Sequence, residues 1–177
     1  MNLTQLVEKI GDYGKDARLN LKNILTVEGA PGLTQKQILG TALASAYTAG
    51  EAELVAAIRA ESETVLSPEE VKAAQAASTL MAMNNVYYRT LHLTGRKELA
   101  QLPAKLRMTF LANPGIPKVD FEIYCLAVSS QAGCGRCIDS HMEVLAKGGL
   151  ALEGIQSAIR IASIIESAAT ALRIARM

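Results

Sequence analysis

Apolar residues recur every three or four positions over most of the chain, the spacing that places them on one face of an α-helix. The segment KQILGTALASAYTAG, residues 36–50, is typical, and Thr34 and Gln37 ahead of it resemble a capping box at a helix start. No segment keeps the alternation of apolar and polar residues that a half-buried strand requires. The pattern therefore predicts helices and no β-sheet.

The sequence SPEE, residues 67–70, marks a second and stronger helix start. Ser67 can cap the helix, Pro68 suits its first position, and Glu70 completes a capping box. The helix is predicted to continue to about Leu93, where a Thr-Gly pair follows.

Glycines and prolines divide the second half of the chain into further predicted helices. In chain order we expect a short helix at about 97–111, a rigid turn in NPGIPK at 113–118, a helix over about 119–132, another over about 134–148, and one or two helices within 151–175.

Short segments resemble one another at similar places in the two halves of the chain. LSPEEV (66–71) and LALEGI (150–155) each follow one predicted helix and open another, and ALAS (42–45) and CLAV (125–128) lie upstream of them. These similarities indicate either a duplicated helical unit or two amphipathic hairpins in an alanine-rich protein. In a duplicated unit, the second copy would hold the cysteines and the first would serve as scaffold.

The composition favours the same fold class. Half of the 177 residues are hydrophobic, only 4% are aromatic and there is no Trp, so Ala, Leu and Ile supply most of the apolar surface. Such a mixture suits packed helices better than sheets. The length fits one domain with a core of its own. We therefore expect a single-domain all-α helical bundle over residues 1–177.

The charge and hydropathy narrow the choice of partners. With 18 basic and 17 acidic residues the net charge is +1, so we expect neither nucleic acid nor a membrane surface as a partner. The most apolar stretch, 155–175, is interrupted by Arg160, Glu166 and Arg173, which argues against a transmembrane helix. The first residues lack the apolar core of a signal peptide, and we expect a cytoplasmic protein.

Two of the three cysteines form a CxxC pair, which in a reducing compartment is not part of a disulfide framework. If a helix begins at Cys134, then Cys137 lies one turn further on and His141 one turn beyond that. Two thiols and an imidazole then share one face of the helix. This arrangement is typical of redox or metal chemistry, and the added histidine favours redox.

The two thiols differ in what would make them reactive. Cys134 stands at the expected helix N-terminus, where the dipole and free N–H groups favour a thiolate, and Arg136 adds positive charge. His141 can reach Cys137 as a base, four residues away, whereas Cys134 is seven residues away and expected nearer the solvent-facing end. Glu122, a lone acid in an apolar helix, is expected to hold His141. Helix position and histidine spacing therefore point to different cysteines.

Other interpretations of these residues stay open. Zinc would take both cysteines and His141, but a fourth ligand is not evident and structural zinc is almost always four-coordinate. The pair can also reflect chance packing, and Glu122 can pair with Lys118. Cys125 is expected to be a buried small hydrophobe, and His92 to be structural or on the surface.

Two segments resemble the alkyl hydroperoxidase D (AhpD) family. One is ANPGIPKVDFEIYCLAVSSQAGCGRCIDSH, residues 112–141, and the other is MAMNNVYYR, residues 81–89. Taken alone, the amides and tyrosines of the second segment indicate only an interhelix or subunit contact. The CxxCxxxH core by itself is shared with the wider carboxymuconolactone decarboxylase-like superfamily, whereas the resemblance to AhpD covers the whole chain.

The resemblance implies roles for four residues. Cys137 matches the cysteine that becomes a sulfenic acid, Cys134 matches the resolving and proton-donating cysteine, and His141 with Glu122 matches the relay that activates the thiol. Mycobacterial members have a histidine between the cysteines. This chain has Arg136 there, which supplies charge but cannot act as a base.

The resemblance also implies an all-α fold, a homotrimer and a thiol peroxidase that reduces alkyl hydroperoxides. The reductant is a dihydrolipoyl group on a partner protein, which in the mycobacterial form serves the peroxiredoxin AhpC, and no bound metal, flavin or haem is implied. A rival function is a dithiol adaptor that passes electrons from a lipoyl enzyme to a peroxiredoxin and barely reacts with peroxide. A third interpretation is a decarboxylase of the wider superfamily, against which the dithiol argues.

Overall fold

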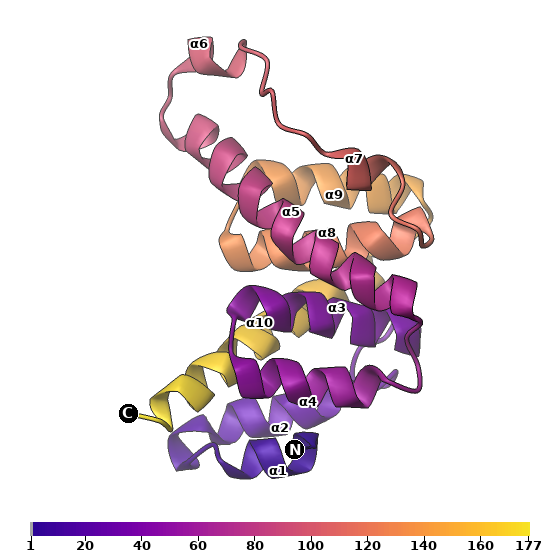
Figure 1. Cartoon of the computed structure of the whole chain (residues 1–177), viewed down its shortest axis with the longest axis vertical. Helices are drawn as coiled ribbons and strands as arrows, with labels where there is room; N and C mark the ends of the chain where they lie inside the picture. Colours follow the sequence, from indigo (N-terminus) through magenta and orange to yellow (C-terminus); the bar gives the residue numbers. More distant parts are fainter. Residues whose placement is uncertain (1) are drawn as a thin grey trace.

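A computed structural model describes residues 2–177, and within this range it contains helices and no β-strand (Figure 1). In chain order the elements are α1 (Leu3–Glu8), the 3₁₀ helix η1 (Asp12–Gly14), α2 (Lys15–Ile24), α3 (Gln35–Ala49), α4 (Ala52–Ser62), α5 (Pro68–Leu93), α6 (Lys97–Ala100), α7 (Thr109–Ala112), α8 (Lys118–Ala132), α9 (Gly135–Lys147) and α10 (Leu152–Ile174). No helix in this part of the chain is long and apolar enough to cross a lipid bilayer. The all-α prediction is confirmed.

Helix α8 lies at the centre of the bundle and contacts α3, α5, α9 and α10. Residues 121–129 of this helix are all buried, because α8 is apolar on nearly every side and such a helix belongs inside a protein. Two polar side chains in this stretch, Glu122 and Ser129, find hydrogen-bond partners on the neighbouring helices α9 and α5. The need to satisfy these buried groups ties α8 to the two helices that surround the site.

Both predicted capping boxes are present. Thr34 Oγ1 accepts a hydrogen bond from the Gln37 N–H at 3.3 Å, and Gln37 Oε1 accepts one from the Thr34 N–H at 2.9 Å. The equivalent distances between Ser67 and Glu70 are 3.2 and 2.6 Å. Helices α3 and α5 therefore begin where predicted, and α5 ends at Leu93 as expected.

The link between α8 and α9 is one tight turn. Gly133 adopts a left-handed conformation with φ 65°, its N–H donates to the Ser130 carbonyl, and the N–H of Cys134 donates to the Ser129 carbonyl. These two bonds form a Schellman motif, which ends a helix. The carbonyl of Cys134 then accepts the first hydrogen bond of α9, from the N–H of Ile138 at 2.9 Å. Cys134 thus belongs both to the end of α8 and to the start of α9.

The predicted helix at 97–111 is wrong. The structure has two short helices there, α6 and α7, separated by residues 101–108 without regular structure. Pro103 lies in this segment, and a proline removes a backbone donor and disfavours helical geometry at the residue before it. Lys105 has a positive φ of 51°, which is incompatible with a right-handed helix. Residues 94–112 instead form an arm that leaves the end of α5 and returns beside α9 (Figure 1).

The order of the helices repeats along the chain. Helices α3, α4 and α5, of 15, 11 and 26 residues, are followed after the arm by α8, α9 and α10, of 15, 13 and 23 residues. Helices α3 and α8 both end at a left-handed glycine, Gly50 and Gly133. Helix α3 contacts α10 and α8 contacts α5, so the first helix of each unit packs on the last helix of the other. This arrangement favours a duplicated unit, and 151–175 holds one long helix rather than two.

Helix α3 crosses α8 so closely that Gly40 has no room for a side chain. A Cβ built there would lie 1.9 Å from the hydroxyl oxygen of Tyr124, which is buried and cannot move aside. We expect Gly40→Ala to lower the free energy of unfolding by about 1–3 kcal/mol, the usual cost of overpacking a core, as measured by urea denaturation. Gly135→Ala is the control, because a Cβ there meets nothing within 4 Å. Equal stability of Gly40→Ala and the native protein would contradict this close crossing.

Candidate active site

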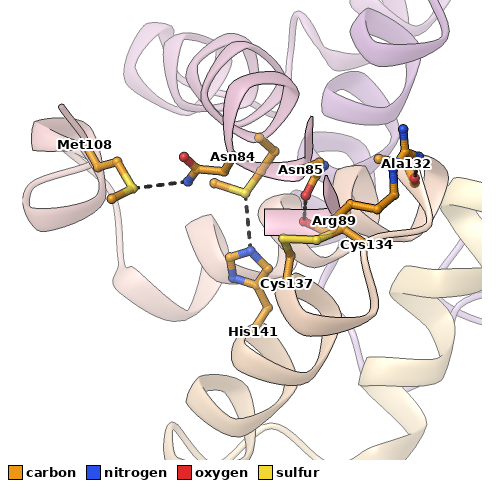
Figure 2. The surroundings of a disulfide bond; sticks show 10 residues. Asn84, Asn85, Arg89, Met108, Ala132, Cys134, Cys137 and His141 are labelled. Carbon is orange, nitrogen blue, oxygen red and sulfur yellow. Dashed lines mark hydrogen bonds between the residues drawn. A yellow bond between two sulfur atoms is a disulfide. The ribbon is translucent and has the colours of Figure 1, made fainter. Parts of the chain in front are cut away.

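Cys134 and Cys137 form a disulfide at the N-terminus of α9, with their Cα atoms 5.3 Å apart (Figure 2). This Cα separation is usual for a disulfide. The Schellman turn places Cys134, and the first turn of α9 carries Cys137, so local backbone geometry is enough to bring the two sulfurs together. The pair can therefore cycle between dithiol and disulfide without rearranging distant parts of the chain.

Only one of the two cysteines faces open space. Cys134 is completely buried, whereas Cys137 is 6% exposed and lines a cavity. The expectation that Cys134 lies nearer the solvent is therefore wrong. Helix α5 contacts both α8 and α9, and its Arg89 donates a hydrogen bond to the carbonyl of Ala132, close to Cys134 (Figure 2).

Glu122 and His141 come together from neighbouring helices. His141 Nδ1 lies 2.7 Å from Glu122 Oε2, and both side chains are buried. A buried carboxylate without a partner is costly, so this pairing accounts for a lone acid in the apolar α8. Among the ion pairs within residues 2–177, none joins Glu122 to Lys118. With Nδ1–H donating to the carboxylate, the neutral ring presents Nε2 as its acceptor.

His141 Nε2 is directed toward α5, where the sulfur of Met81 lies 3.3 Å away. A thioether is a weak hydrogen-bond acceptor and cannot donate, so Nε2 remains available to a thiol or to a ligand. His141 and Cys137 stand four residues apart on α9 and line the same cavity. The structure thus brings together Glu122, Cys134, Cys137 and His141. Cys134 is bonded to the sulfur of Cys137 and is not itself among the residues that line the cavity.

A cavity of about 300 Å³ lies over Cys137 and His141. Its wall comes from three parts of the chain: α5 contributes Met81, Asn84 and Tyr88, the arm contributes Met108 and Leu111, and α9 contributes Arg136 and Ser140 beside the two reactive residues. Thioether, alkyl and aromatic groups make up most of this wall, with a few polar groups between them. Such a lining is typical of a site for a small organic molecule.

The two amides on α5 have different places in the structure. Asn85 Oδ1 accepts a hydrogen bond from Ser129 Oγ at 3.0 Å, which is the interhelix contact that this segment indicates. Asn84 lines the cavity, where its Nδ2 lies 3.3 Å from Met108 Sδ and its Oδ1 is buried without a partner (Figure 2). The sequence alone does not assign Asn84 to the site. The signal that could have done so is its four-residue spacing from Tyr88, which places both on one face of α5.

Arg136, the residue between the cysteines, lies at the edge of the cavity. Its guanidinium carbon lies 5.3 Å from the centroid of the Tyr88 ring, a cation–π contact. Tyr88 in turn packs edge to face against Tyr87, with ring centroids 5.1 Å apart. The positive charge at this position is thus held over the mouth of the cavity by an aromatic ring.

The remaining cysteine and histidine lie away from the cavity. Cys125 is fully buried in α8, as expected, and burial together with the nearby charge of Glu122 raises the pKa of its thiol well above the usual value. Such a thiol is a poor nucleophile. His92 is exposed near the end of α5. The described part of the chain holds no group of three or more His, Cys, Asp and Glu side chains arranged to bind a metal ion.

Comparison with known proteins agrees with this geometry. Residues 97–177 match the model of the carboxymuconolactone decarboxylase family. The chain is 49% identical to the alkyl hydroperoxide reductase AhpD of Maricaulis maris, over 97% of this chain and 98% of the relative. It is 48% identical to the protein of that name from Rhizorhabdus wittichii, over 96% of each, and 45% identical to that of Methylocella silvestris, over 100% of this chain and 98% of the relative. Identity at this level over nearly the full length shows that the chain belongs to the AhpD family of alkyl hydroperoxide reductases.

Proposed function

We propose that this protein is a thiol-dependent alkyl hydroperoxide reductase in antioxidant defence, with Cys137 as the residue that attacks the peroxide. One observation carries the proposal: of the two cysteines, Cys137 lines the cavity that also holds His141, while Cys134 is completely buried. The relatives named alkyl hydroperoxide reductase support the same activity.

The reaction uses the two thiols in turn. The Cys137 thiolate attacks one peroxide oxygen, the O–O bond breaks, and the alcohol leaves after taking a proton, so that Cys137 becomes a sulfenic acid. The thiol of Cys134 then attacks the sulfenic sulfur, water leaves, and the disulfide forms. The burial of Cys134 keeps this second thiol from meeting peroxide first.

His141 prepares Cys137 by accepting its proton, directly or through a water. An ordinary cysteine has a pKa of about 8.5, so a base is needed to make the thiolate at neutral pH. Glu122 holds Nδ1 and stabilises the imidazolium that forms, which leaves Nε2 as the base. Arg136 cannot pass a proton on, so the relay consists of His141 and Glu122.

The disulfide is re-reduced by a dihydrolipoyl group on a partner protein. The incoming thiolate must reach a sulfur, and because Cys134 is buried we place the mixed disulfide on Cys137, with Cys134 as the leaving thiol. These steps require no bound metal, flavin or haem. We propose an AhpC-like peroxiredoxin as a second partner, which the resemblance to the mycobacterial form supports.

We also propose that the protein works as a homotrimer in the cytoplasm. The arm and the end of α5 expose three large apolar side chains that are close in the sequence, Leu93, Leu99 and Leu102, and exposed apolar surface is typical of subunit contacts. A dithiol that must return to its reduced state fits a reducing compartment.

The trimer can be tested by sedimentation equilibrium. We expect Leu102→Glu to release monomers, because a charge would be buried at the contact. Leu19→Glu, which changes a similarly exposed leucine on α2, should leave the trimer intact. A native protein that sediments only as a monomer would rule out the assembly.

The roles of the two cysteines predict opposite labelling patterns. Cys134→Ser protein should accumulate a sulfenic acid on Cys137 that a dimedone-type probe captures after one equivalent of peroxide. Cys137→Ser protein should show little capture and negligible turnover, and neither variant should cycle with a dithiol through the internal disulfide. Cys125→Ala is the control and should keep both the disulfide and turnover, since Cys125 lies away from the cavity. Probe on Cys134 and none on Cys137 would reverse the two roles.

The relay predicts a specific effect of Glu122→Gln. The amide keeps the size and one acceptor oxygen but removes the charge that stabilises the imidazolium, so we expect the fold to persist and turnover to fall by about two orders of magnitude. The rate at which iodoacetamide alkylates reduced Cys137 at neutral pH should fall as well, because it follows the thiolate fraction. Glu153→Gln, at an exposed acid on α10, should change neither rate. Native rates in the Glu122→Gln protein would make this residue structural.

The adaptor and decarboxylase interpretations are separated from the peroxidase by direct assays. Turnover of an alkyl hydroperoxide with dihydrolipoamide, without any peroxiredoxin, supports the peroxidase. Electron transfer to a peroxiredoxin with no such turnover would identify an adaptor. Decarboxylase activity that persists after both cysteines are replaced would support the decarboxylase interpretation.

A further inference from the structure

The cavity has two chemically different ends. At its buried end lie Cys137, His141 and the side chain of Asn84, whose Oδ1 has no partner among the described residues. At its exposed edge lies Arg136. The wall between the two ends is formed mainly by apolar and aromatic groups, among them Tyr88.

The charge of the lining is one-sided. Arg136 is the one permanently charged side chain among the described lining residues, and no carboxylate lines this cavity. Within residues 2–177, no carboxylate oxygen lies within 4 Å of the Arg136 guanidinium, whose recorded contact is the face of Tyr88. Arg136 also lines a second hollow together with the acids Asp139 and Glu143, but neither carboxylate comes within 4 Å of its guanidinium. A guanidinium with unused donors at the mouth of an apolar cavity is suited to bind a carboxylate.

We propose that Arg136 is a substrate-binding residue and that the preferred substrates are hydroperoxides whose short apolar body ends in a carboxylate. This inference rests on the proposed peroxidase activity and deepens it by naming the class of peroxide. The carboxylate binds Arg136 at the mouth, the alkyl chain lies along the thioether and aromatic wall, and the hydroperoxide reaches the buried end. There the unpartnered Asn84 Oδ1 accepts the peroxide O–H.

The volume of the cavity indicates a short substrate. A volume of about 300 Å³ has room for about ten non-hydrogen atoms, taking about 30 Å³ for each water-sized group. An ω-hydroperoxyhexanoate meets this limit. The reduction of this peroxide needs no other reagent than the thiolate and one proton. The Cys137 thiolate takes the terminal oxygen and becomes the sulfenic acid as the O–O bond breaks, and ω-hydroxyhexanoate leaves after accepting a proton from His141.

The test compares ω-hydroperoxyhexanoate with its methyl ester, which has the same chain and no charge. The reductant is dihydrolipoamide, a small neutral dithiol, so that contacts with a partner protein do not enter. We expect kcat/KM for the acid to exceed that for the ester by about tenfold in the native protein, as one charge-assisted contact allows. Arg136→Gln should bring this ratio close to one, and Arg136→Lys should keep part of it, because lysine supplies charge without the planar fork.

Arg160→Gln is the matched control, because Arg160 is an exposed arginine on α10 that lies outside the cavity lining. It should keep the native ratio, and circular dichroism should show an unchanged helix content in every variant. If the native protein turned over both peroxides with nearly equal kcat/KM, the proposed substrate class would be wrong, whereas the proposed peroxidase activity would be supported. Failure to turn over either peroxide would remove the proposed function itself.

Two further outcomes would assign Arg136 differently. An equal loss for acid and ester in Arg136→Gln would mean that the guanidinium acts on the thiolate rather than on the substrate. A loss that appears only when a lipoyl-bearing protein replaces dihydrolipoamide would place Arg136 on a protein-docking surface. Either result overturns the inference.

Discussion

The hydrogen bond between Glu122 and His141 is the contact on which the arrangement of the site depends. It joins α8, whose residues 121–129 are all buried, to the helix that carries the sulfurs, α9. Because neither polar group tolerates burial alone, the contact fixes how α9 is rotated about its axis. That rotation sets the direction of Cys137, one turn before His141. Helix α5 contacts both of these helices and forms another side of the cavity.

Much of this arrangement could be predicted from the sequence because it is local. Capping boxes predict the starts of α3 and α5, and a glycine predicts the end of α8. The spacing of Cys134, Cys137 and His141 places them on one face of a helix because of the helix repeat. The partner of His141 could also be inferred, since a lone acid in an apolar helix needs a reason to be buried. Each of these inferences uses residues that are close in the sequence or a single unfavourable group that demands a partner.

What the sequence could not provide depends on contacts between distant segments. Met81, Asn84 and Met108 line the cavity at the reactive pair, yet they lie 25 residues or more before Cys134, and no short-range pattern places them there. The burial of Cys134 also depends on packing between helices, so its position at a helix end does not predict its accessibility. Residues 101–108 of the arm interrupt the helical pattern because Pro103 outweighs the apolar spacing around it.

The two groups of three helices, α3–α5 and α8–α10, start their middle helix differently. Glu51 begins α4, where its carboxylate accepts hydrogen bonds from the N–H groups of Glu53 and Leu54 and pairs with Arg176. Cys134 begins α9 without any side-chain cap, and a missing cap costs a helix about 1 kcal/mol. In the oxidised enzyme a covalent bond to Cys137 holds this end of the helix instead. The reduced enzyme, which is the form that meets the substrate, is therefore the form whose reactive helix end frays more easily.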